Sequence, residues 1–501
     1  MVIAIAEETF DVVVAGGGGA GLAAAIEACT AGRTVVLLEK GASLGGSTAW
    51  SVGSVTASAT PYQTRKGIKD RPADHWREMA TFNGDLDPRD NPDLRRVLAD
   101  AMPDTFRWLL SHGIRFYGPM PEPPHRKPRM HNVLPNAQSF IVHLERAARR
   151  AGADIRLNTR AIELLVKEGQ VVAVDCHTPA GSCRFRARGG VVLATGDFTN
   201  DPELKVRYMG PQEAKVDGVN VNATGDGQKL ATRIGARIVN GDLALGPELR
   251  FIPPQNRNIL LKLPPWRALA NLMAWSLDHL PSGLLRPFVM SFVTTALAPS
   301  PNLFGEGAIL VNSRGERFTN ETDKPAYLVP DQPDKVAYIL LDNRLMQQFS
   351  AWPHFISTAP GVAYAYVDDY RRNRPDVFAS AGTLAELATK LGMPDGSLTA
   401  TVSDYNNRAG NRPTLGGGPY VALGPARAVF VHAEGGLAVD REHRVLGPDD
   451  RPIPGLYAAG SAGQGGLLLK GHGHHLAWAF ASGRRAGRQA AYASATTDMP
   501  S

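Results

Sequence analysis

The chain has 501 residues, of which 43% are hydrophobic and 20% are charged, and its formal net charge at pH 7 is +6. These values are ordinary for a globular protein and exclude a disordered chain, while the length predicts two or three domains. The basic residues are scattered and no aromatic-basic pattern occurs, so we expect no nucleic-acid partner.

The cysteines and the N-terminus narrow the class further. Cys29, Cys176 and Cys183 form no C-x-x-C pair and no metal-ligand spacing. This pattern argues against a disulfide framework, an iron–sulfur centre and a c-type haem. The first residues lack a basic segment followed by a long apolar stretch, so no secretory signal is predicted. A cytoplasmic location is the expectation.

Residues 10–40 contain the parts of a dinucleotide-binding β-α-β unit in the required order. A buried strand at 12–14 precedes a G-x-G-x-x-G turn, a helix over 22–31 and a second buried strand at 35–38. Glycines let the backbone approach a pyrophosphate, and the helix N-terminus faces the phosphate charge. An acid after the second strand can accept hydrogen bonds from ribose hydroxyls. The expected cofactor contacts here are Gly16, Gly18, Gly19, Ala20, Gly21 and Glu39.

A second glycine-rich turn follows this acid closely, and Rossmann domains that bind only NAD have no use for it. It comprises Lys40 and, after a short gap, Gly45, Gly46, Ser47 and Thr48. Here the sequence resembles the flavoproteins of the fumarate reductase and 3-ketosteroid dehydrogenase superfamily, in which such a turn runs along the FAD. The resemblance implies FAD as the cofactor. Ser47 replaces the histidine that links FAD covalently in the succinate dehydrogenase branch, so noncovalent FAD is expected.

The middle of the chain continues the same pattern. Residues 72–112 and 137–151 are predicted to be helical, and residues 153–174 to form a pair of strands. A buried strand at 190–193 then runs into Ala194, Thr195 and Gly196. In flavoproteins with two dinucleotide-binding motifs, this A-T-G sequence brings the chain back to the cofactor.

Further motifs extend the resemblance over essentially the whole chain. Residues 223–227 resemble a T-G-D-G helix start in which Asp226 contacts the cofactor region and can cap the helix. Residues 311–321 resemble an N-x-x-G-x-R-F-x-N-E segment of the capping domain. Residues 435–440 and 455–466, which include Gly460, resemble the return to the FAD domain.

The order of these motifs predicts an α/β fold, with a Rossmann-like FAD domain of the two-dinucleotide-binding type and an inserted α+β capping domain. Residues 1–245 and 426–501 are expected to form the FAD domain, and residues 246–425 the cap. The active site is expected between them, because ligands often bind at domain interfaces.

Residues 259–300 within the cap are unusually apolar. They contain no proline-free apolar run of about 20 residues, which excludes a membrane-spanning helix there. Three interpretations stay open: a peripheral membrane contact, a hydrophobic substrate entrance, or a subunit interface in a homo-oligomer.

The resemblance also bears on the reaction. A dicarboxylate reductase of this superfamily would carry an arginine after the Asn-Glu pair, and an arginine and a histidine near the C-terminal glycines. Here Asn320-Glu321 is followed by T-D-K-P-A-Y, and residues 470–475 read K-G-H-G-H-H. Fumarate-type chemistry is therefore not expected.

The ketosteroid dehydrogenases carry an E-S-A-P-Y-like sequence after the same Asn-Glu pair, which makes Tyr327 the implied catalytic base. Their C-terminal Y-P-G-A-G-A-T segment aligns with residues 469–475, so the backbone N–H of Gly473 is expected to face a substrate carbonyl. Leu469 stands where that family has its tyrosine. Another donor must then polarise the carbonyl.

Histidines near these glycines are the candidates for that role, and His472 and His474 are named as further catalytic residues. His475 and Leu476 are expected near the FAD. A metal site is not expected, because zinc needs a further ligand and nothing nearby in the sequence supplies one. A second polar cluster at 125–131 is open between a solvated loop and a substrate-binding segment.

Together these features predict a FAD-dependent dehydrogenase that introduces a C=C bond α,β to a ketone in a steroid-like or smaller alicyclic substrate. Donors on the ketone oxygen stabilise the enolate while a base removes the α-proton, and the β-hydrogen leaves as hydride to the flavin. Reoxidation requires an external electron acceptor. The alternatives are an enone or enoate reductase that runs the same steps in reverse, and a non-catalytic membrane-associated flavoprotein.

Overall fold

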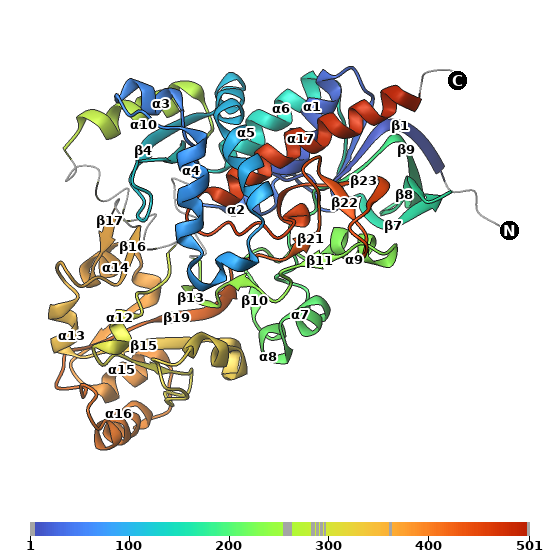
Figure 1. Ribbon diagram of the computed structural model, residues 1–501. Coiled ribbons are helices and arrows are strands. Elements are labelled where there is room, and N and C mark those ends of the chain that lie inside the picture. The colour runs from blue at the N-terminus through green and yellow to red at the C-terminus, as the bar shows by residue number, and fades with distance from the viewer. Residues whose placement is uncertain are drawn as a thin grey trace.

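The computed structural model describes residues 6–253, 263–281, 286, 290, 294, 297–359 and 363–497. They form a larger domain, in which helices pack on a mainly parallel sheet, and a smaller domain below it in Figure 1. This arrangement confirms the predicted α/β class.

The larger domain is built on an eight-stranded sheet in the order β22-β23-β9-β1-β2-β6, with β8 also on β9 and β7 on β8. The strands β23, β9, β1, β2 and β6 run parallel. Val12, Val13 and Val14 are fully buried, as central parallel strands require, because helices cover both faces of such sheets. The bounds are β1 Ala6–Ala15, β2 Val35–Leu38, β6 Asp154–Arg156, β7 Arg160–Lys167, β8 Gln170–Thr178, β9 Gly181–Leu193, β22 Arg444–Leu446 and β23 Pro452–Ala458.

Helices and short strands complete this domain. The helices are α1 Gly19–Thr30, α2 Gly46–Trp50, α3 Pro61–Arg65, α4 Pro72–Met79, α5 Pro92–Ser111, α6 Gln138–Arg150, α7 Pro202–Tyr208, α8 Pro211–Ala214, α9 Asp226–Arg233 and α17 His474–Thr497. A small antiparallel sheet contains β3 Ser54–Thr56, β4 Arg115–Met120 and β5 Met130–Leu134, and β11 Ile238–Val239 pairs with β21 Gly436–Leu437.

Two predicted segments differ in detail from the structure. The helical region 72–112 is interrupted between α4 and α5 by short 3-10 turns, the second of which ends at Arg89. The Asn91 side chain then caps α5, which begins at Pro92. The strand pair at 153–174 is a three-residue β6 followed by the β7–β8 hairpin. Proline at the first helical position explains why α5 starts afresh.

The smaller domain has a six-stranded sheet in the order β10-β19-β15-β14, with β13 and β18 also paired with β19. Its strands are β10 Asp217–Gly218, β13 Glu248–Phe251, β14 Ile309–Val311, β15 Ala337–Leu341, β18 Phe378–Ala381 and β19 Tyr420–Phe430, and β16 Ser357–Ala359 pairs separately with β17 Ala363–Ala365. Its helices are α12 Asn302–Gly305, α13 Asn343–Gln348, α14 Val367–Asn373, α15 Leu384–Leu391 and α16 Ser397–Arg408, with the 3-10 segment η4 at Pro325–Asp331. Helix α10 (Arg267–His279) lies beside α3 in Figure 1 and contacts β4 and β5 of the larger domain.

A two-stranded ribbon joins the two domains. β12 (Ala244–Leu245) pairs antiparallel with β20 (His432–Ala433), and the next residues continue as the β13–β19 pair. The main hydrophobic cores lie on either side of this ribbon, one within residues 12–236 and 437–491 and the other within 216–430. The boundaries at 245/246 and 425/426 stay a prediction, and both fall within the ribbon.

Helix α10 lies in the apolar segment 259–300, in which residues 259–262 and much of 282–296 lie outside the described residues. Trp266, Leu272 and Trp275 have 68%, 58% and 52% of their surface exposed. Among the helices that the structure describes, none is both long and apolar enough to cross a lipid bilayer.

The last helix lies directly against the first, backbone to backbone. A Cβ atom on Gly487 would lie 2.2 Å from the carbonyl oxygen of Ala24, and one on Gly483 equally close to that of Ala20. Contacts below 3.0 Å force the backbone to move, so only glycine permits this spacing.

We predict that Gly487→Ala lowers the free energy of unfolding by about 1–3 kcal/mol, the usual cost of overpacking a core. Urea unfolding followed by circular dichroism measures the change. The matched control is Gly305→Ala at the end of α12, where an added Cβ would meet no atom within 4 Å. Equal stability of the two variants would contradict the close α1–α17 contact.

Candidate active site

A cleft opens at the carboxyl ends of β1, β2 and β9, where parallel α/β sheets bind their ligands. Most of the predicted cofactor residues line it. These are Gly16, Gly18, Gly19, Ala20, Glu39, Lys40, Gly46, Ser47, Thr48, Ala194, Thr195, Gly196, Asp226 and Gly460. Thr159, Arg160, Asn220, Asn222 and Ser461 line it as well, and the sequence analysis did not name them.

Glycines shape the floor of this cleft. Gly16 has a φ of +109°, and a Cβ on it would lie 2.3 Å from the carbonyl oxygen of Ala194. A Cβ on Gly21 would collide with the carbonyl oxygen of Gly16, so this glycine serves the packing of α1 and does not line the cleft. At Gly18 the nearest atom to an added Cβ is 3.7 Å away. The space left there lies at the N-terminus of α1, which suits a pyrophosphate.

Charged groups in the cleft are already held by hydrogen bonds. The Glu39 carboxylate accepts from the N–H groups of Gly17 (2.8 Å) and Gly41 (2.7 Å). Lys40 Nζ lies 2.9 Å from Asp226, which also pairs with Arg160 at 2.8 Å. The acid at the end of β2 and the glycine-lined floor together fit the adenosine and pyrophosphate of FAD.

Some predicted cofactor residues have other roles in the structure. Asp226 does not cap α9, because Gly225 precedes that helix without a side-chain cap and the aspartate is engaged by Lys40 and Arg160. Gly45 lies behind the cleft and donates its N–H to the Gly17 carbonyl. Leu476 is buried in the core of the larger domain. None of these changes removes the fit to FAD.

His475 joins His432 of the interdomain ribbon at a buried carboxylate. The Nε2 atoms of His432 and His475 lie 3.3 and 3.4 Å from Oε1 of Glu434. Gln464 donates to the other oxygen of Glu434 at 2.5 Å. Burial alone would raise the pKa of the Glu434 carboxyl, but the two histidines hold it well below its usual value. We call His432, Glu434 and His475 the His432 group.

The His432 group lies beside the cofactor cleft. Gln464 directly follows the 3-10 turn η7 (Gly460–Gly463), whose first residues Gly460 and Ser461 line the cleft. A Cβ on Gly436 would lie 2.7 Å from the Ser461 carbonyl oxygen, so the strand after Glu434 packs on the same turn. An ionised carboxylate is therefore fixed between the cleft and the cap.

His472 lies at the mouth of the same junction. Its side chain is exposed to solvent, but surrounding protein removes part of its hydration and lowers its pKa, and charges on Glu248 and Arg250 of the cap strand β13 act on it. Its backbone N–H donates to Oε1 of Glu122 at 2.5 Å, and burial raises the pKa of that carboxyl to about 7. His472 is thus a solvent-accessible imidazole that faces the cap.

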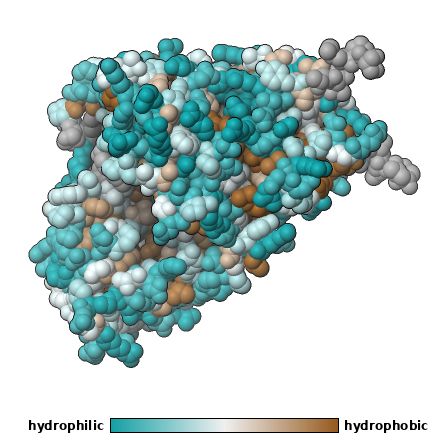
Figure 2. Space-filling model, in the orientation of Figure 1, coloured by the Kyte–Doolittle hydropathy of each residue, from teal (hydrophilic) through white to brown (hydrophobic). Residues whose placement is uncertain are grey.

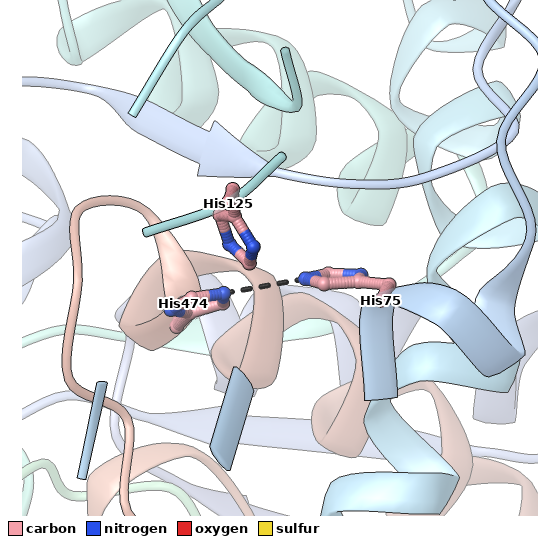
Figure 3. A group of neighbouring side chains, drawn as sticks. All are labelled: His75, His125 and His474. Carbon is pink, nitrogen blue, oxygen red and sulfur yellow. Dashed lines mark hydrogen bonds between the residues drawn. The ribbon is translucent and has the colours of Figure 1, made fainter. Parts of the chain in front are cut away.

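Gly473 has a φ of +88°, and a Cβ there would lie 2.7 Å from the backbone nitrogen of Thr56. Within the described part of the chain its N–H donates to no acceptor, which leaves it available to a carbonyl oxygen. His474 turns the other way, into a buried cluster with His75 and His125 (Figure 3).

Tyr327 lies on η4 in the cap, where its carbonyl accepts a hydrogen bond from Gln212 beside α8. Burial raises the pKa of its phenol, and the charge of Glu213 adds to this shift. Among the described residues no hydrogen bond or ring contact joins Tyr327 to His472 or to the His432 group. Its catalytic role stays a prediction.

Sequence reasoning missed His432, Glu434, His75 and His125 as site residues. His432 and Glu434 lie within three residues before the glycines at 435–436. Polar side chains next to this cofactor-facing motif could have been predicted to lie near the site. His125 was named only within a polar cluster. For His75 the sequence offers no comparable signal, because its partner His474 is far along the chain.

We predict that the yellow protein releases intact FAD on acid precipitation. Ser47 cannot form the histidyl linkage, and in the structure its hydroxyl accepts a hydrogen bond from Asn220 at 2.9 Å. Absorbance and chromatography of the supernatant measure the flavin. Flavin that stays with the precipitate would contradict noncovalent binding.

Comparison with known proteins agrees with this geometry. The FAD binding domain family matches residues 11–259 and 279–468. NADH:fumarate oxidoreductase of Klebsiella pneumoniae (strain 342) is 28% identical over 476 residues, which are 91% of this chain and 44% of that protein, so the chain spans less than half of that relative. The 3-oxosteroid 1-dehydrogenase of Mycolicibacterium smegmatis is 24% identical, with 91% and 92% of the two chains covered. A flavocytochrome c3 fumarate reductase in an open conformation superposes with a TM-score of 0.72 at 27% identity, over 97% of this chain and 79% of that one.

The chain therefore belongs to the FAD binding domain family, within the superfamily of FAD-dependent fumarate reductases and succinate dehydrogenases, and FAD is its cofactor.

Proposed function

We propose that the protein desaturates an uncharged ketone at the α,β position, acting as a FAD-dependent oxidoreductase of C=C bonds. The observation that carries this proposal is the buried, ionised Glu434 beside the cofactor cleft. Burial lowers the pKa of His475, and with both histidines neutral Glu434 would repel a dicarboxylate bound there but not a neutral carbonyl compound. Reduction of an enone is the second candidate, because the same groups would serve the reverse reaction.

Two cationic groups in this region are already paired with carboxylates, which also favours a neutral substrate. Arg250 forms a salt bridge with Glu248 at 2.7 Å, and Arg129 is buried between Asp70 and Glu78. Figure 2 shows hydrophobic residues in the hollow between the two domains, while most of the visible face is hydrophilic. An apolar ring system suits such an entrance.

When bound, FAD supplies the hydride-accepting chemistry. The protein's own residues would bind the ketone and move the α-proton. The free N–H of Gly473 would donate to the ketone oxygen and stabilise enolate charge. The imidazole of His472, which is neutral because its pKa is lowered, would take the proton from the α-carbon. Tyr327, on the cap side, is the other candidate for this base.

The proposed reaction also requires a partner that exchanges electrons with the flavin. Electrons must pass to an external acceptor, or come from an external donor if the enone is reduced. Contact of the exposed face of α10 with a membrane surface or a second copy of the chain stays a prediction.

We predict that fumarate reoxidises the anaerobically reduced protein at least about 100-fold more slowly than a cyclic enone does. Two like charges about 4 Å apart repel by about 4 kcal/mol at an effective dielectric constant of 20, which exceeds this factor. Stopped-flow flavin absorbance measures both rates. Glu434→Gln, which removes the charge at nearly constant shape, should narrow the difference. Comparable rates with fumarate and enone in the wild type would refute the preference for neutral substrates.

We predict that loss of the base slows flavin reduction by a cyclic ketone by roughly two to four orders of magnitude while FAD remains bound. Tyr327→Phe and His472→Ala test the two candidates in parallel. Tyr338→Phe is the control, since Tyr338 is another half-buried tyrosine of the cap. If both test variants reduce their flavin at the wild-type rate, neither residue is the base.

A further inference from the structure

Three histidines from distant parts of the chain meet in the interior of the larger domain. His75 lies on α4, His125 in the loop after β4, and His474 is the first residue of α17. Their exposed fractions are 0%, 7% and 0%. The ring centres form a nearly equilateral triangle, with sides of 5.3, 5.4 and 5.5 Å, and Figure 3 shows the rings around a common point. We call these residues the His75 cluster.

The spacing of the rings is that of three ligands around one ion. Nε2 of His75 and Nε2 of His474 are 3.3 Å apart. Around a tetrahedral ion bound at about 2.0–2.1 Å, two ligand nitrogens lie about 3.3–3.4 Å apart and the imidazole centres roughly 5 Å apart. One ring nitrogen from each histidine lies within 4.8 Å of the others.

The hydrogen bonds around the His75 cluster leave nitrogen atoms without partners. Nδ1 of His474 donates to the Lys470 carbonyl at 2.6 Å, so its Nε2 lone pair faces the cluster, as it does in metal-bound histidines. Nε2 of His75 donates to that lone pair at 3.3 Å, so an ion would replace this proton, while Nε2 of His125 is buried with no hydrogen-bond partner. Buried polar atoms of this kind are rare and commonly mark an ion or water.

Two carboxylates and the cations paired with them border the His75 cluster. Arg129 donates to Nδ1 of His125 at 2.9 Å and contacts both Asp70 and Glu78, and Arg126 pairs with Glu78 as well. Because Arg129 donates to Nδ1 of His125, this ring can reach an ion only through Nε2, which would release its proton on binding. A metal-bound His125 would gain imidazolate character, which the Arg129 guanidinium stabilises.

The His432 group does not have this geometry, although it also brings two histidines and an acid together. Its two ring centres are only 3.5 Å apart, and both Nε2 atoms approach the same carboxylate oxygen. Two imidazoles on one tetrahedral ion cannot come so close. The His432 group is a carboxylate held between two rings, and of these two groups the His75 cluster has the ring spacing of an ion site.

We propose that His75, His125 and His474 form a binding site for a divalent transition-metal ion, with Zn²⁺ as its ligand. Three imidazoles and one solvent molecule complete a tetrahedral zinc shell, and the site has no thiolate that would select a softer ion. The ion would tie α4 and the 125 loop to the start of α17. The site is independent of the proposed ketone chemistry, and it revises the expectation of no metal, which rested on ligands close in sequence.

The test uses the FAD-loaded, full-length protein after treatment with a chelator. We expect isothermal titration to show one Zn²⁺ per chain, and Co²⁺ to give tetrahedral d–d bands to the red of the flavin absorption. His75→Gln should lower zinc affinity by more than about 100-fold, because even changes outside the ligand shell cost about 10–100-fold. His112→Gln, at the end of α5, is the matched control and should bind normally.

His432→Gln distinguishes the two histidine groups and should retain the zinc. Loss of zinc in His432→Gln with retention in His75→Gln would overturn the proposal. If His75→Gln does not fold, as judged by FAD content, His125→Gln replaces it. Measurements on the wild-type protein are a test in themselves. Absence of stoichiometric zinc binding, or Co²⁺ binding without tetrahedral bands, would overturn the proposal.

Discussion

The backbone contact between α1 and α17 is the constraint on which the rest of the site depends. α1 carries the phosphate-facing turn at its start, and α17 begins with the histidines that face the cap and the interior. Because Gly483 and Gly487 bring the two helices together without intervening side chains, the position of one helix determines that of the other. The cofactor cleft and the histidines are thus positioned by a single packing contact.

Neighbouring histidines at the start of α17 contact different parts of the protein. Successive side chains on a helix point about 100° apart, so His474 and His475 cannot face the same group. His474 points into the His75 cluster and His475 toward Glu434. His472, just before the helix, remains open to solvent. A short run of similar residues therefore provides an interior cluster, a carboxylate partner and a cleft-facing imidazole.

The sequence predicted best what depends on neighbours in the chain. The β1-α1-β2 unit, the glycines at 16–21 and the acid at 39 follow from local patterns, because strand, turn and helix are contiguous there. The partners of the histidines did not follow, since His75 and His474 meet only in the tertiary structure, where α4 packs on α5 and α5 packs on α17. Asp226 was predicted to cap its helix because cap signals are local, whereas its partners in the structure come from distant parts of the chain: Lys40 follows β2 and Arg160 begins β7.

The ribbon that connects the two domains also bears side chains that act at the junction. His432 lies on β20, and Glu248 and Arg250, whose charges act on His472, lie on β13. Rotation of the cap would twist these paired strands, because the pairs β12–β20 and β13–β19 are separated only by Gly246 and Pro247 on one side and by Val431 on the other. A twist of the ribbon would change the distance from His432 to Glu434 and the field at His472 together. Cap position and the charge state of the junction are therefore mechanically coupled.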